Sequence, residues 1–236
     1  MSAVATPIPV GHDAPAITSD DTAPVAPTQR VGIVGAGKLG MALARAALAA
    51  GYEVAVAGSG PAERIGLTVD VLAPGAIAST VAQVVEFGEV IVLAVPTHRF
   101  RDLPSDLFDG KVVVDAMNYW PDTDGEDAEL ASADGGSSAV VQAHFRGARV
   151  VKSLNQLGYH ELDDYPREHR APDRIAMAAV GDDRLAVRTV MRFIDRLGFD
   201  AVDGGPLASG KRLEPDGSPY AQTFTVDELA ARLAAG

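Results

Sequence analysis

Three glycines at a fixed spacing carry the clearest chemical signal in this sequence. Gly35, Gly37 and Gly40 stand in the hexapeptide GAGKLG, between the apolar run Arg30–Val34 and an alanine-rich segment over residues 39–50. A G-x-G-x-x-G between a strand and a helix is typical of dinucleotide binding, because its glycines allow a tight turn, leave room for a pyrophosphate and let the helix pack closely. The first N–H groups of the helix then face the phosphates. We therefore expect a pyrophosphate site, rather than a purely structural turn, made by Gly35, Ala36, Gly37, Lys38, Leu39 and Gly40.

The end of the second expected strand indicates which dinucleotide is bound. Residues 53–57 are followed by Gly58, Ser59 and Gly60, with no carboxylate to accept hydrogen bonds from the adenosine ribose of NAD. A hydroxyl at Ser59 and a guanidinium at Arg64 suit a 2′-phosphate instead. The pattern favours NADP over NAD, and a solvated helix residue is the competing interpretation of Arg64.

Strands and helices alternate along the rest of the chain, which predicts an α/β fold. We expect a Rossmann-type, doubly wound and mostly parallel sheet with a small C-terminal extension. A polar, glycine-containing loop is expected over residues 119–138, and a capping box at Thr225–Glu228 predicts a terminal helix. The expected strands cover residues 30–34, 53–57, 76–78, 89–95, 111–115, 149–154, 174–180 and 199–202, and the other expected helices cover 39–50, 80–87 and 182–197.

The first 29 residues differ in composition from the remainder. They contain five prolines and no lysine or arginine, which is typical of a disordered leader and lacks the basic start of a secretory signal. We expect residues 30–236 to form a single NADP-binding domain whose C-terminal α/β portion covers about residues 150–236. A chain of this length can bury one sizeable core.

Composition excludes several classes of function. The formal net charge of −12 argues against a nucleic-acid partner, because phosphate contacts need a basic surface. No apolar stretch is long enough for a membrane span, and we expect a cytoplasmic protein. The chain has no cysteine, and it shows no H-E-x-x-H, histidine or carboxylate cluster, so no metal is expected.

An ordered set of short motifs resembles the NADP-dependent oxidoreductases of the deazaflavin coenzyme F420. Besides the glycine hexapeptide and the AGS segment at residues 57–59, the chain carries LAVP, VDAMN and VVKSLN at later strand ends, then VGDD and DGGPL, followed by Glu214. The resemblance covers residues 30 to about 214. It implies hydride transfer between NADP(H) and coenzyme F420, both bound at the carboxyl ends of the strands, usually in a homodimer.

The resemblance also assigns roles to single residues. Ser59 and Arg64 fall where the family binds the 2′-phosphate, and Asn155 matches its cofactor-facing position after the sixth strand. Gly60 stands where family members often have an arginine. The tail after Glu214 does not resemble the usual helical end of the family.

Hydride transfer between two rings demands distance and orientation rather than a strong base. We therefore expect small or apolar side chains at the strand ends around the nicotinamide and its acceptor, with Asn155 projecting over the nicotinamide. No residue is assigned as catalytic, and His98 is left open as an acid, a base or a solvated loop histidine. The expected cleft comprises Pro96, Thr97, His98, Met117, Asn118 and Asn155, and Ala94, Val95 and Pro96 are also expected to contact the dinucleotide.

Two other functions remain open at this point. The chain is compatible with NADPH-dependent reduction of another acceptor, either a flavin or a small molecule, and with a non-catalytic NADP-binding regulatory module. Arginines recur every four residues on the last long helix, either as a solvated face neutralised by Asp183 and Asp195 or as a docking site for an anionic partner. They are Arg184, Arg188, Arg192 and Arg196.

Overall fold

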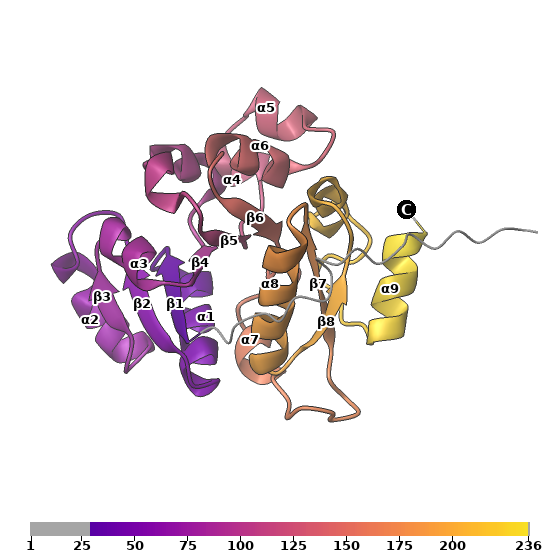
Figure 1. The fold of residues 1–236 in the computed structure, drawn as a ribbon, viewed down its shortest axis with the longest axis horizontal. Coiled ribbons are helices and arrows are strands. Elements are labelled where there is room, and N and C mark those ends of the chain that lie inside the picture. Colours follow the sequence, from indigo (N-terminus) through magenta and orange to yellow (C-terminus); the bar gives the residue numbers. More distant parts are fainter. Residues whose placement is uncertain (1–28, 236) are drawn as a thin grey trace, which may run out of the picture.

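A computed structural model describes residues 29–235 and shows one eight-stranded sheet with helices on both faces (Figure 1). The strand order is β3-β2-β1-β4-β5-β6-β7-β8, and every adjacent pair is parallel except β6 and β7. The predicted Rossmann-type α/β class is thereby confirmed. The strands are β1 (Arg30–Val34), β2 (Glu53–Ala57), β3 (Ile77–Ser79), β4 (Val90–Leu93), β5 (Val112–Asp115), β6 (Arg149–Lys152), β7 (Ala176–Gly181) and β8 (Asp200–Asp203).

The expected leader over residues 1–29 lies outside the described residues except for Gln29. The Gln29 backbone N–H donates to a carboxylate oxygen of Glu89 at 2.7 Å, so this residue is attached to the folded domain. The Gln29 carbonyl also accepts from Glu53, at the start of β2. The folded part of the chain therefore includes Gln29.

The predicted long loop over residues 119–138 contains helices instead. It holds α4 (Pro121–Asp124), α5 (Ala128–Ser132) and the start of α6 (Ser137–His144). The Asp127 side chain caps α5 by accepting from two backbone N–H groups, and Pro121 occupies the first turn of α4. Both are ordinary helix-start signals, but helices of one turn are too short to show a hydrophobic period.

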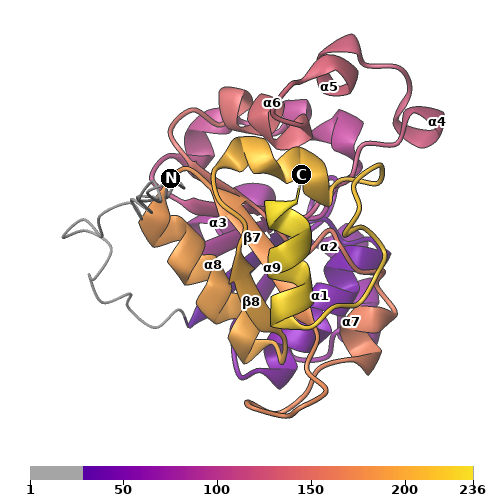
Figure 2. The same ribbon diagram turned by 90° about the vertical axis from the view of Figure 1, so that its right-hand side faces the viewer.

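Two apolar layers enclose the sheet. One face packs against α1 (Lys38–Ala49) and α8 (Arg184–Arg196), and the opposite face packs against α3 (Val81–Phe87) and α6. A third apolar cluster joins β7 and β8 to α9 (Val226–Ala234), which lies across these strands in Figure 2. The remaining α-helices of the described residues are α2 (Glu63–Leu72) and α7 (Glu161–Asp164), and 3₁₀ helices cover Thr97–Asp102, Ser105–Phe108 and Leu207–Leu213.

The arginine-rich face of α8 makes contacts within the protein. Arg184 pairs with Asp203 at 2.8 Å, and Arg196 donates to the carbonyl groups of Ala50 and Gly51 beyond the end of α1. Of the two expected neutralising aspartates, Asp183 caps α8 and Asp195 pairs with Arg174 at 2.8 Å. The ends of this face therefore connect α8 to neighbouring elements.

A buried ion pair joins the carboxyl ends of β5 and β6. Lys152 and Asp115 are both fully buried, with 3.4 Å between the ammonium nitrogen and a carboxylate oxygen. The Asp115 carboxylate also accepts from the Ser138 hydroxyl at 2.6 Å and from the Met117 N–H at 3.0 Å, while Lys152 donates to the Met117 carbonyl. Every charge in this cluster is therefore hydrogen-bonded.

We expect Lys152→Met to lower the free energy of unfolding by about 3–5 kcal/mol, because it leaves the Asp115 carboxylate buried and unpaired. Urea denaturation followed by circular dichroism measures this loss. Adding Asp115→Leu to that variant should recover part of the stability, since the unpaired charge is then removed. Asp163→Asn breaks the exposed pair with Arg45 and serves as the control, with an expected loss of about 1 kcal/mol or less. A loss for Lys152→Met no larger than this control would contradict the role given to the buried pair.

Candidate dinucleotide and acceptor site

The glycine hexapeptide forms a turn with no room for side chains on its inner side. Gly35 has φ +128°, and a Cβ there would overlap the carbonyl group of Ala94 after β4. A Cβ at Gly40 would overlap the carbonyl of Gly35. These contacts place the start of α1 directly beside the ends of β1 and β4.

Gly37 is different, because a Cβ there would meet nothing within 4 Å. It is exposed, has φ −85° and precedes α1 without offering a side-chain cap to the first N–H groups of the helix. The space above the turn is therefore open, and donors at the positive end of the helix dipole face it. A pyrophosphate fits this arrangement.

An open cleft of about 860 Å³ lies along the carboxyl ends of β1, β2 and β4. The glycine turn, residues 94–96, Arg99 and Asp102 are among the residues that line it. The structure brings many of the expected site residues to this one cleft. They are Gly35, Ala36, Gly37, Ser59, Arg64, Ala94, Val95, Pro96 and His98.

Three members of the hexapeptide are placed around the turn rather than on the cleft wall. Lys38 is exposed, with its ammonium nitrogen 5.4 Å from the centre of the Tyr159 ring. Leu39 packs against the main apolar cluster, and Gly40 is buried against Gly35. The side chain of Leu39 therefore serves the packing of α1.

Arg64 folds back over Gly60 in the turn after β2. Its guanidinium Nη1 donates to the carbonyl of Ser59 at 3.4 Å, and Gly60 has φ +119°. A Cβ at Gly60 would lie 3.3 Å from that same nitrogen, so the glycine leaves the space that Arg64 occupies. Arg64 thus places a guanidinium group beside Gly60, the position at which the resembling family often has an arginine.

The structure corrects the expected position of Asn155. Its side chain is 2% exposed, and its amide donates to the Asn118 side chain at 2.9 Å and to the Leu213 carbonyl at 2.7 Å. Leu154, with φ +63°, turns the chain inward just before it. Asn155 therefore holds the strand ends together and does not line the 860 Å³ cleft, where it was expected.

Thr97, Met117 and Asn118 belong to the same scaffold below the cleft. Thr97 is buried and its hydroxyl donates to the Asn118 carbonyl at 2.7 Å, while Met117 is buried in the second apolar layer. Asn118 is half-buried and its amide donates to the carbonyl of Asn155 at 3.0 Å. None of the three lines the 860 Å³ cleft.

Sequence reasoning missed other residues around this edge of the sheet. Arg99 and Asp102 line the cleft and form an ion pair at 2.6 Å. Trp120 is 43% exposed and meets Tyr220 edge to face, with 5.9 Å between the ring centres. Trp120 lies two residues after Asn118, so its position after β5 was a usable signal, whereas the approach of Tyr220 depends on the path of the C-terminal tail.

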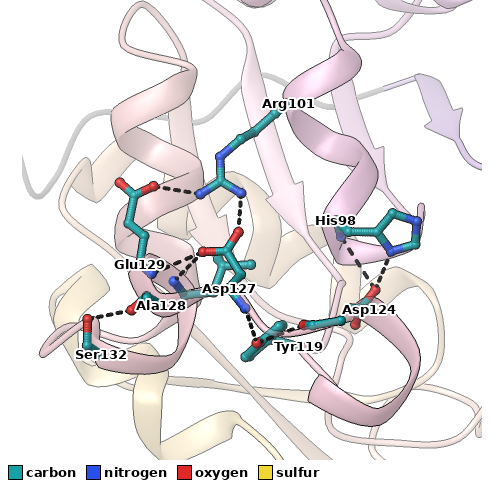
Figure 3. A network of polar contacts seen from close by, with 10 residues as sticks. His98, Arg101, Tyr119, Asp124, Asp127, Ala128, Glu129 and Ser132 are labelled. Carbon is teal, nitrogen blue, oxygen red and sulfur yellow. Dashed lines mark hydrogen bonds and ion pairs between the residues drawn. The ribbon is translucent and has the colours of Figure 1, made fainter.

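His98 lines the cleft and is bonded to a helix that the sequence did not predict. Its Nδ1 lies 2.8 Å from a carboxylate oxygen of Asp124 on α4, as Figure 3 shows. The Asp124 side chain is 5% exposed and the His98 side chain 44%. The pair therefore joins an inner carboxylate to an imidazole at the surface of the cleft.

Comparison with known proteins agrees with this geometry. Residues 30–119 match the family model described as NADP oxidoreductase, coenzyme F420-dependent. The predicted resemblance is confirmed over these residues. The match supports NADP-dependent oxidoreduction as the chemistry of this family, whereas a comparison with curated proteins gives no match.

Solved structures share the fold over most of the chain. The hypothetical protein SMa0349 from Sinorhizobium meliloti is 28% identical, with a TM-score of 0.73 over 84% of this chain and 95% of that one. A protein described as a putative F420-dependent NADP-reductase from Arthrobacter sp. FB24 is 21% identical, with a TM-score of 0.64 over 78% and 88%. The imine reductase BcSIRED from Bacillus cereus BAG3X2 is 19% identical, with a TM-score of 0.55 over 78% of this chain and 57% of that one.

The described residues were also compared with the requirements of a metal site and of a membrane span. Within residues 29–235, no group of three or more histidine and acidic side chains could hold a metal ion. No helix in that same part of the chain is long and apolar enough to cross a membrane.

We expect Gly37→Val to abolish dinucleotide binding and to leave the fold intact, because a branched side chain fills the open space while its backbone angles stay allowed. Fluorescence titration with NADPH measures the affinity, and circular dichroism measures the fold. Gly66→Val is the matched control, since a Cβ at Gly66 also meets nothing within 4 Å and Gly66 does not line the cleft. Unchanged affinity in the folded Gly37→Val protein would show that the site lies elsewhere.

Arg64→Ala should weaken NADPH binding by about 1.5–3 kcal/mol, the scale of a charge-assisted hydrogen bond. NADH affinity should barely change, because NADH has no 2′-phosphate. Arg64→Lys keeps the charge without the planar guanidinium and should give an intermediate loss. Equal losses for both coenzymes in calorimetric titrations would make Arg64 a structural residue.

Proposed function

We propose that this protein transfers a hydride between NADP(H) and the deazaflavin coenzyme F420. The observation that carries the proposal is the open space above Gly37, which adjoins the Ser59–Arg64 turn in one cleft of a family-matched segment. This cleft combines a pyrophosphate site with a cation at its adenosine end. When bound, NADPH supplies the hydride.

The residues of the chain bind and orient the coenzyme and the acceptor, and none of them forms a covalent intermediate. The N–H groups at the start of α1 hold the pyrophosphate, and Arg64 with the Ser59 hydroxyl holds the 2′-phosphate. Pro96 lines the cleft after β4 and, having no N–H, offers a ring an apolar wall with a fixed backbone angle. Below it, the Asn118–Asn155 hydrogen bonds keep the ends of β5 and β6 in place.

The resemblance of the sequence motifs and the family description support the deazaflavin as the acceptor. A deazaflavin is a planar conjugated ring, and the exposed Trp120 follows shortly after β5 in the chain. Aromatic rings of this kind stack on one another with favourable energy. We therefore infer an acceptor site on the Trp120 side of Pro96.

The purified wild type should oxidise NADPH rapidly with coenzyme F420 and slowly with riboflavin, with a small imine or without an acceptor. Loss of NADPH absorbance and of oxidised deazaflavin absorbance, followed together, measures the transfer and its stoichiometry. Gly37→Val provides the inactive control. Turnover of an ordinary flavin or an imine without turnover of the deazaflavin would replace the proposed acceptor, and tight NADPH binding with no turnover of any acceptor would indicate a regulatory module.

A further inference from the structure

We propose that His98 donates the proton that accompanies hydride transfer to the acceptor, and that Asp124 orients and stabilises it. This inference rests on the proposed function, because it concerns the same cleft. It gives a catalytic role to a pair that neither the sequence motifs nor the family description assigns. The class of acceptor is a planar conjugated heterocycle with a nitrogen that gains a proton on reduction.

The Asp124 carboxylate is held through both of its oxygens. One oxygen lies 2.8 Å from His98 Nδ1 and accepts from the His98 backbone N–H at 3.4 Å. The other oxygen accepts from the Trp120 N–H at 2.9 Å. With Nδ1 occupied, Nε2 is the ring nitrogen left for a ligand, and it makes no hydrogen bond to any residue between 29 and 235.

Sheet order places this pair on the β4–β5 side of the cleft. The 2′-phosphate residues Ser59 and Arg64 follow β2, whereas His98 follows β4 and Asp124 follows β5. The order β2-β1-β4-β5 puts the pair two strands or more from the adenosine end. A dinucleotide that extends from Arg64 across the glycine turn therefore brings its nicotinamide toward His98.

A network of charges keeps the pair in place. Arg101, on the same short 3₁₀ segment as His98 (Thr97–Asp102), binds Asp127 at 2.7 Å and Glu129 at 2.6 Å (Figure 3). The Tyr119 hydroxyl accepts from the Asp127 N–H at 2.8 Å and donates to the Gly125 carbonyl at 3.0 Å. The segment that carries Asp124 is thus fastened to the segment that carries His98.

His169 forms a more exposed histidine–aspartate pair, which serves as a comparison. His169 Nδ1 lies 3.2 Å from Asp195, and the two side chains are 67% and 47% exposed. That aspartate is shared with Arg174, and His169 does not line the cleft. The His98 pair is shorter, has an inner carboxylate and opens onto the ligand site, which are the features that a proton donor needs.

The chemistry balances as a two-electron reduction. The acceptor gains a hydride from NADPH at a ring carbon and a proton from His98 Nε2 at a ring nitrogen. The N–H bond of the imidazolium breaks, its electron pair stays on the ring, and solvent returns a proton to the exposed side chain. Asp124 lies on the Nδ1 side of the ring, and the other charged residues that line the same cleft are Arg64 and the Arg99–Asp102 ion pair.

Steady-state kinetics with NADPH and coenzyme F420 tests the proton transfer, using His98→Gln, Asp124→Asn and the control His169→Gln. Removing a general acid typically costs about 10²–10⁴-fold, so we expect kcat to fall about 10²-fold or more in His98→Gln, and by a smaller factor in Asp124→Asn. The pH profile of kcat should change in His98→Gln and stay unchanged in His169→Gln. Added imidazole should restore activity to His98→Ala. The kcat of His169→Gln should equal that of the wild type. The NADPH affinity of every variant should stay unchanged.

A second measurement does not depend on turnover. Nitrogen NMR of neutral His98 should show the Nδ1–H tautomer in the wild type and a mixture of tautomers in Asp124→Asn. A mixture in the wild type would contradict the His98–Asp124 hydrogen bond, whatever the acceptor is.

The kinetic outcomes separate the remaining possibilities. Loss of NADPH affinity in proportion to rate would make His98 a coenzyme ligand instead, and an unchanged kcat in His98→Gln would exclude His98 as the proton donor. A wild type that binds NADPH but reduces no acceptor would overturn the proposed function and this inference together, whereas an active wild type matched by His98→Gln overturns this inference alone.

Discussion

The cleft depends on a steric constraint, which is that three pieces of backbone meet where no Cβ fits. Gly35 packs on the carbonyl of Ala94, and Gly40 packs on the carbonyl of Gly35, so the ends of β1 and β4 and the start of α1 are in direct contact. Because they are in contact, the open N–H groups of α1 and the chain after β4 share one rim. A side chain at either glycine would push these elements apart and so distort the cleft between them.

A second constraint fixes the other half of the sheet edge. The buried pair of Lys152 and Asp115 ties β6 to β5, and the amides of Asn118 and Asn155 continue the same connection beyond the strands. The residues to which we assign roles in binding the acceptor and donating the proton lie on the short segments that follow β4 and β5. His98 and Trp120 are both bonded to Asp124, which makes α4 the link between the scaffold and the cleft.

The sheet and the coenzyme turn were predictable because their signals are local. Apolar runs for β1 and β2, the glycine spacing and the missing carboxylate after Ala57 all lie within short stretches of sequence. The placement of Asn155 was not predictable, since the left-handed backbone at Leu154 and the distant carbonyl of Leu213 decide it. Nor could the sequence predict that Asp124 meets His98, because a one-turn helix has no hydrophobic period and the contact spans 26 positions.

We expect the cleft to select a 2′-phosphorylated dinucleotide through Ser59 and Arg64. Calorimetric titration of the wild type with adenosine 2′,5′-bisphosphate and with adenosine 5′-monophosphate tests it without hydride transfer or an acceptor. The bisphosphate should bind about tenfold more tightly or better, because one charge-assisted hydrogen bond contributes about 1.5 kcal/mol of binding free energy. Equal affinity for the two fragments would contradict it.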